Sequence, residues 1–197
     1  MDPLRPYWDF DDLDATEARF RALRAEALTQ LARVEGLRGR FDEGDRLLDQ
    51  AARETDARVR IRVHLERGRL RRSSGDREAA LPLFEQAWEA ALAAGEEWLA
   101  ADAAHMCALA APGRDGFLAW TQRGIDLAET SEAASYWLGP LLNNLGWECF
   151  DAGEHAQALA AFERALAARE REPENVAALE AARAAVDEAR RALEQGV

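Results

Sequence analysis

Lysine is absent from this chain, and all 25 basic residues are arginine. We interpret this as a composition bias without functional meaning. Cysteine is scarce as well. Cys107 and Cys149 are isolated and form neither a CxxC pair nor a Cys/His spacing typical of metal sites. Both are therefore expected to be buried, reduced thiols, and the sequence predicts no metal and no other cofactor.

The sequence also lacks any run of about 18 apolar residues, the length that a membrane-spanning helix needs. Its first 20 residues are acidic and contain no basic segment followed by an apolar stretch, as a secretory signal would. The formal net charge of −12 repels phosphate groups. We therefore expect a cytoplasmic protein with neither nucleic acid nor membrane as its partner.

Residues with β-branched side chains are few, whereas Ala, Leu, Arg and Glu are abundant. These abundant residues lose little rotamer freedom in a helix, so the composition favours an all-α protein. A chain of 197 residues is long enough for one extended domain, and no second domain is required.

A pattern of small and aromatic residues lies within the stretch NNLGWECFDAGEHAQALAAFERAL, residues 143–166. The pattern recurs around the glycines at 39 and 75, and residues 98–129 leave room for one more copy. Small residues suit the crossing of two helices, and an aromatic ring fills the space between neighbours. The matching positions are Leu145, Gly146, Gly153, Ala158, Phe162 and Ala165 in the last copy, and Gly68, Gly75, Ala80, Phe84 and Ala87 in the second.

This pattern resembles the tetratricopeptide repeat, a helix-turn-helix unit of about 34 residues. The longer period and the Asn-Asn-Leu-Gly sequence at Asn143 are more similar to the kinesin light-chain-like bacterial branch. The resemblance implies an α-α superhelix, a right-handed solenoid of about four helical hairpins with a C-terminal capping helix. The expected segments are an arm at 1–14, repeats at 15–56, 57–95, 96–130 and 131–173, and a capping helix at 174–197.

Three local features lead to further expectations. Asp14 with Glu17 suggests a capping-box start for the first helix. Tyr7, Trp8 and Phe10 predict that the arm packs onto the repeats, because exposed aromatic rings are costly. Pro140 requires either a kinked helix or a helix that begins at this residue, and we prefer the kink.

The first helix of each hairpin lines a concave groove in the resembled architecture. At about 100° per residue, Asn143, Asn144 and Trp147 fall on that side. The resemblance implies that Asn144 holds the backbone of a bound peptide. The alternative is that both asparagines only hydrogen-bond neighbouring helices. The equivalent groove positions in the earlier repeats include Arg33, Arg62, Arg69 and His105.

Residues 58–77 carry eight arginines against Glu66 and Asp76. Half of the arginines at 58, 60, 67 and 71 are expected to pair with acidic residues on adjacent repeats. Those at 62, 69 and 72 have a register that directs them to the groove. This surplus predicts an acidic or carboxylate-bearing peptide ligand.

The three histidines, at 64, 105 and 155, belong to no HExxH, GxSxG, P-loop or GxGxxG motif. A catalytic or metal site assembled from His105, Cys107, Asp151 and His155 stays an alternative, although helix packing explains all four. The sequence therefore favours a non-enzymatic module that binds a peptide or helix of another protein. The alternatives are a regulatory sensor of a signal peptide or small ligand and a structural homo-oligomer, for example a homodimer.

Overall fold

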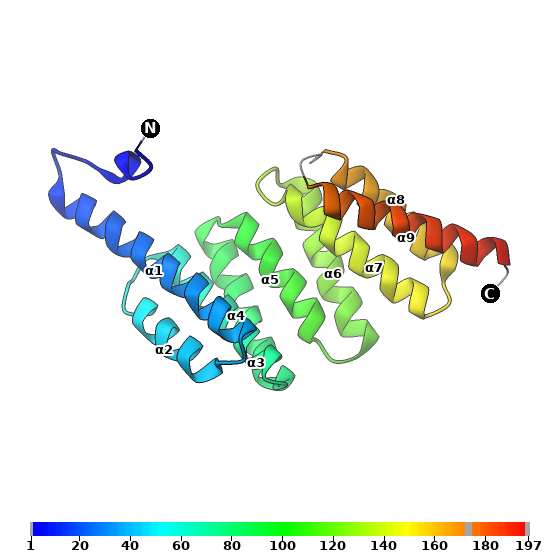
Figure 1. The fold of residues 1–197 in the computed structure, drawn as a ribbon, viewed down its shortest axis with the longest axis horizontal. Helices are drawn as coiled ribbons and strands as arrows, with labels where there is room; N and C mark the ends of the chain where they lie inside the picture. The colour runs from blue at the N-terminus through cyan, green and yellow to red at the C-terminus, as the bar shows by residue number, and fades with distance from the viewer. Residues whose placement is uncertain (1, 172–174, 196–197) are drawn as a thin grey trace. The chain divides into compact units, whose positions relative to one another are not determined.

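The computed structural model describes residues 2–171 and 175–195, and every regular element in these residues is helical (Figure 1). Two short 3-10 turns, η1 (Arg5–Tyr7) and η2 (Ser135–Trp137), accompany the α-helices. The predicted all-α class is confirmed. The α-helices are α1 (Leu13–Leu37), α2 (Phe41–Ala51), α3 (Ala57–Ser73), α4 (Arg77–Ala94), α5 (Glu97–Ala110), α6 (Gly113–Thr130), α7 (Leu138–Asp151), α8 (His155–Arg169) and α9 (Val176–Gln195).

The helices form hairpins within two compact units, residues 1–99 and 100–197. In the first unit α1 pairs with α2 and α3 pairs with α4, and α1 also packs along α3. In the second unit α7 pairs with α8, and α9 packs on α8 (Figure 1). The boundary between the units falls inside α5. Each unit is described by itself.

The turns of three hairpins lie at the glycines that the sequence predicts. Gly39, Gly75 and Gly153 have φ angles of 75°, 95° and 76°. This left-handed conformation reverses the chain after a helix and is costly for residues with a Cβ atom. The chain turns between α5 and α6 at residues 111–112, slightly before the turn predicted near residues 112–115, because α6 already begins at Gly113.

A glycine and a phenylalanine lock the two helices of a hairpin together. Phe84 on α4 is buried, and its ring lies so close to Gly68 on α3 that a Cβ atom there would overlap it. Phe162 on α8 lies against Gly146 on α7 in the same way. The small residues predicted at the helix crossings therefore have a direct steric reason.

The N-terminal arm folds back onto α1. Asp9 and Thr16 exchange two hydrogen bonds of 2.8 Å, and the rings of Tyr7 and Trp8 lie 5.8 and 5.5 Å from that of Phe20. The start of α1 differs from the expected capping box. Asp12 caps the helix by accepting a hydrogen bond from the Ala15 amide at 2.9 Å. The helix therefore begins at Leu13.

The preferred kink at Pro140 is wrong. Helix α7 begins at Leu138, directly after the 3-10 turn η2, so Pro140 lies in its first turn. Backbone N–H groups in a first turn have no partner within the helix, and proline loses nothing there. The alternative that the helix begins near this proline describes the structure better.

Helix α9 occupies most of the segment predicted to cap the array. Its apolar stripe packs against α8 and α7, while most of its remaining side chains are exposed. The predicted start of this segment at 174 and its end at 196–197 lie outside the described residues. The buried residues of the stripe are Ala182, Ala185, Val186 and Ala189.

Candidate peptide-binding surfaces

The arginines predicted for the groove of the first unit lie along the contact between α1 and α3. Glu66 on α3 is only 1% exposed, and its Oε1 lies 2.6 Å from Arg69 Nη1 and 3.7 Å from Arg33 Nη1. A buried carboxylate needs such partners because removal from water penalises its charge. Arg69 itself is 12% exposed, whereas Arg33 is about half exposed. Of this pair, Arg33 offers the more accessible cation.

Arg62 is also engaged within the protein. Its Nε lies 3.3 Å from an oxygen of Glu26 on α1, and its side chain is 18% exposed. Arg58 shares Glu26 and also pairs with Glu96 at 3.2 Å. Arg62 and Arg69 therefore have carboxylate partners within the protein, from the preceding hairpin and from the same helix. That they bind a ligand stays a prediction.

Of the remaining α3 arginines, Arg67 and Arg71 form ion pairs, and Arg72 forms none with the residues that the structure describes. Arg67 pairs with Asp45 and Asp49, and Arg71 pairs with Asp45 at 2.7 Å, as the sequence predicts for this outer side. Arg72 differs, because no carboxylate in the described part of the chain forms an ion pair with it. Burial lowers the pKa of Arg72, and the positive charge of Arg77 acts in the same direction.

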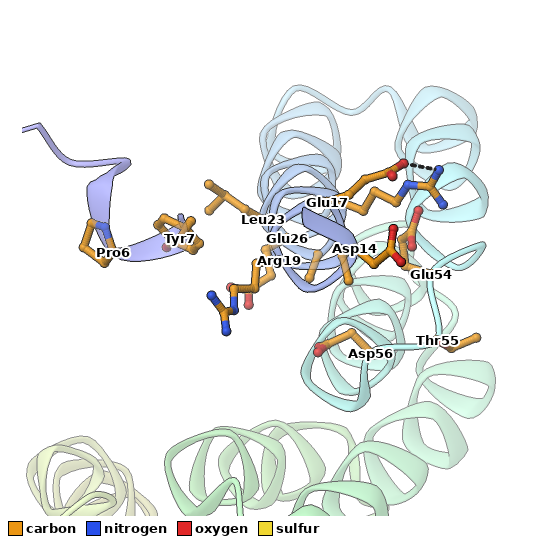
Figure 2. A pocket seen from close by; sticks show the side chains of 13 residues that line it. Pro6, Tyr7, Asp14, Glu17, Arg19, Leu23, Glu26, Glu54, Thr55 and Asp56 are labelled. Carbon is orange, nitrogen blue, oxygen red and sulfur yellow. Dashed lines mark ion pairs between the residues drawn. The ribbon is translucent and has the colours of Figure 1, made fainter. Parts of the chain in front are cut away.

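Sequence reasoning missed a cleft of about 810 Å³ between the N-terminal arm and α1. Figure 2 shows Pro6 and Tyr7 on one side of it and the side chains of α1 and residues 54–56 on the other. Glu17 in this cleft pairs with Arg21 at 2.6 Å. Five carboxylates line the cleft against two arginines, so it would repel an acidic peptide: Asp14, Glu17, Glu26, Glu54 and Asp56, with Arg19 and Arg21.

In the second unit, three of the predicted residues come from α5 and α7. Asn144 Nδ2 lies 3.4 Å from His105 Nδ1, and the imidazole ring lies 5.4 Å from the ring of Trp137. Asn143 and Asn144 are both half-buried. The structure thus joins Asn144 to a neighbouring helix, as the alternative interpretation expects, but through one long hydrogen bond. An amide group has further donor and acceptor capacity.

Asn143 and Asn144 also line a cavity of about 230 Å³ where α7, α8 and α9 meet. The guanidinium group of Arg169 lies in its wall, close to Gly139 and 5.3 Å from the ring centroid of Tyr136. Most of the remaining wall is apolar and consists of small side chains. It is formed by Gly139, Pro140, Ala165, Ala178, Ala181 and Ala182.

Trp147 has a different role from the predicted one. Its ring packs edge-on against Phe162 and Phe150, with centroid distances of 5.0 and 5.6 Å. The side chain therefore belongs to the apolar cluster between α7 and α8. Helical register placed Trp147 on the groove side, but it does not determine the direction in which the indole ring turns.

Of the four residues in the alternative catalytic site, Asp151 is exposed, and the other three are engaged in ordinary helix packing. His155 lies against the ring of Phe150 at 4.9 Å, Cys107 is buried, and His105 contacts Asn144. Burial raises the pKa of the second thiol, Cys149, and the Glu154 carboxylate acts in the same direction. Among residues 2–171 and 175–195, no group of three or more His, Cys, Asp or Glu side chains could hold a metal ion.

Comparison with known proteins shows which proteins resemble this chain in sequence and fold. Residues 139–171, which form α7 and α8, match the family model described as tetratricopeptide repeat. The chain thus contains a sequence match to one tetratricopeptide repeat (TPR) and has a TPR-like fold. No curated protein matches the chain. None of the helices that the structure describes is long and apolar enough to cross a membrane.

A solved structure supports the TPR fold over most of the chain. It is a crystal structure of a single-residue variant of a Podospora anserina protein that is assigned as a kinesin light chain with nearly identical TPR-like repeats. The two chains are 19% identical, with a TM-score of 0.53 over 88% of this chain and 93% of the other. This likeness shows the fold alone. The predicted TPR architecture is confirmed, whereas the bacterial branch stays a prediction.

Proposed function

We propose that this chain is a cytoplasmic interaction module whose second unit binds an extended peptide segment of a partner protein. The TPR fold is of the protein-interaction kind. The observation that carries the proposal is the pair of half-buried amides, Asn143 and Asn144, beside a cavity of about 230 Å³. Together they offer backbone recognition and space for a side chain.

The two amides suit the backbone of an extended peptide. An asparagine side chain has two N–H donors and one carbonyl acceptor, so it can pair with both polar groups of a peptide unit. An extended peptide leaves these groups unpaired, and its binding surface must satisfy them. Asn144 gives one interaction to His105 and keeps acceptor capacity. Sequence preference would then come from the neighbouring cavity.

The cavity favours a peptide side chain that is short and acidic. Its alanine and proline walls accept the aliphatic part of such a side chain, and the guanidinium of Arg169 attracts a carboxylate. In the first unit, Arg33 is the most accessible of the predicted cations. Arg62 and Arg69 instead support the helix pairing through Glu26 and Glu66. We therefore place the acidic preference at Arg169.

A displayed library of random peptides tests the proposal. The wild-type protein should enrich peptides with a recurring Asp or Glu, and an enriched peptide is then titrated by calorimetry. Asn143→Ala with Asn144→Ala should weaken its affinity at least about tenfold, because each lost hydrogen bond costs roughly 0.5–1.5 kcal/mol. The matched control is Gln157→Ala, an exposed amide on α8, which should leave affinity unchanged. Failure to enrich any peptide, or equal affinity of both variants, would contradict the proposal.

A further inference from the structure

Exposed large apolar side chains concentrate on one part of the first unit. Of eleven such residues in the described part of the chain, seven lie on the N-terminal arm and on α1. They form two groups at opposite ends of this helix. One group lies near its start and the other near its end: Leu4, Trp8, Phe10 and Leu13, and Leu31, Val34 and Leu37.

These groups belong to the side of α1 that faces away from the core. Ala25, Thr29 and Ala32 are buried on the inner side, where α2 and α3 pack. At about 100° per residue, the opposite side carries Phe20, Ala27, Leu31 and Val34. The arm covers the N-terminal half of this outer stripe, at Thr16 through Asp9 and at Phe20 through Tyr7 and Trp8. Its C-terminal half is an apolar helix face in contact with water.

The two ends of the stripe carry opposite charge. Residues 2–17 contain six carboxylates and one arginine, whereas residues 31–40 contain three arginines and one carboxylate. The single carboxylate, Glu35, already pairs with Arg38 and Arg40. A surface that is acidic at one end and basic at the other is complementary to an antiparallel copy of itself.

We propose that the outer face of α1 pairs with the same face of a second copy of this chain, in an antiparallel two-fold dimer. A two-fold interface uses one surface twice, so each contact occurs in duplicate. With Ala27 at the centre, Leu31 meets the Leu23 position of the second copy, and Val34 meets the arm rings that cover Phe20. The small Ala27 side chain permits close approach of the helices. Trp8 and Phe10 then cover the end of the second α1.

Light scattering with size exclusion tests the dimer. The wild-type protein should have about twice the mass of the 21.8 kDa chain, with a monomer fraction that grows on dilution. Leu31→Glu with Val34→Glu should give the monomer mass, because two charges would be buried in the interface. The matched control, Leu92→Glu with Leu193→Glu, alters two comparably exposed leucines on α4 and α9 and should stay dimeric. A monomeric wild type, or a dimer unaffected by the α1 variant, overturns the proposal.

Charge reversal tests the antiparallel arrangement. Arg38→Glu with Arg40→Glu makes both ends acidic, and Asp2→Arg with Asp11→Arg and Asp14→Arg makes both ends basic. Each variant alone should raise the dimer dissociation constant at least about tenfold through like-charge contacts. An equimolar mixture should regain the wild-type dissociation constant, because both contacts of the mixed dimer are again complementary. If mixing restores nothing, the antiparallel pairing is wrong.

Discussion

The hairpins α3/α4 and α7/α8 use the same internal packing to support different surfaces. Corresponding positions lie 78 residues apart, as the turn glycines Gly75 and Gly153 do. In both hairpins a buried phenylalanine fits against a glycine of the first helix, Phe84 with Gly68 and Phe162 with Gly146. The steric lock is thus the same in both units.

The surfaces differ at positions next to these glycines. Glu66 and Arg69 form a buried ion pair on α3, whereas the corresponding residues of α7 are Asn144 and Trp147. Asn144 makes one long hydrogen bond, and Trp147 packs on Phe162. The same glycine–phenylalanine contact therefore occurs beside a buried ion pair in α3 and beside an amide and an aromatic ring in α7. We propose that the amide groups of α7 contact a ligand.

The largest expected effect comes from breaking the shared lock. Phe84→Ala and Phe162→Ala should each destabilise the protein by about 3–5 kcal/mol, because each leaves a cavity at a fully buried site. Denaturant unfolding monitored by circular dichroism measures this loss. A marked loss in one variant with none in the other would show that the two hairpins do not share the lock.

A smaller effect on stability is expected at the two positions next to the glycines, Glu66 on α3 and Asn144 on α7. Glu66→Gln should cost about 3 kcal/mol, because it removes the charge of a carboxylate that is 1% exposed and paired with Arg69. Asn144→Ala should cost less than about 1 kcal/mol, because it removes a single neutral hydrogen bond. The same unfolding experiment compares both. Equal costs would mean that Glu66 is no more important to stability than the amide at its equivalent position.

The smallest expected effect is a pH dependence of stability that arises from His64 in the first unit. Burial lowers the pKa of His64, and the charges of Arg60 and Arg67 act in the same direction. The unfolded chain then binds the proton more tightly, so stability should fall as the pH drops below about 6.5. His64→Leu, which copies the equivalent Leu142 of α7, should flatten this part of a melting-temperature profile. Glu35 and Glu154, whose pKa values are lowered by arginines, lose stabilising charge only below about 4.5.

If the melting temperature of the His64→Leu variant falls at low pH as steeply as that of the wild type, His64 is not the source of this pH dependence. A matched measurement on His155→Leu distinguishes loss of any histidine from loss of His64. His155 lies in the second unit against Phe150, so this variant removes a histidine without altering the surroundings of His64.

The hairpins could be predicted from the sequence because their determinants are local. A glycine that must adopt positive φ, a small residue at a crossing and a phenylalanine at a fixed interval all recur at regular spacing. The arm could be anticipated too, since Tyr7 and Trp8 needed a surface to cover. Such signals depend on residue type and interval, and both are visible in one sequence.

The candidate site was less predictable because its contacts depend on residues far apart in the sequence. Arg62 pairs with Glu26 of the preceding hairpin, and helical register alone does not identify that partner. Trp147 lies at the predicted position, but its side-chain conformation directs the ring to Phe162. The cavity beside Asn143 needs the approach of α9, which the repeat pattern does not specify. The amides were found because they resemble a family position.

The central claim is that Asn143 and Asn144 contact a peptide ligand while the aromatic packing beneath them stays intact. Its most direct measurement follows the side-chain amide signals of both residues by nuclear magnetic resonance during titration of a library-selected peptide. We predict saturable shifts of both amide signals and a steady signal for Gln157 on the exposed side of α8. Binding that saturates while the signals of Asn143 and Asn144 do not move would contradict the claim.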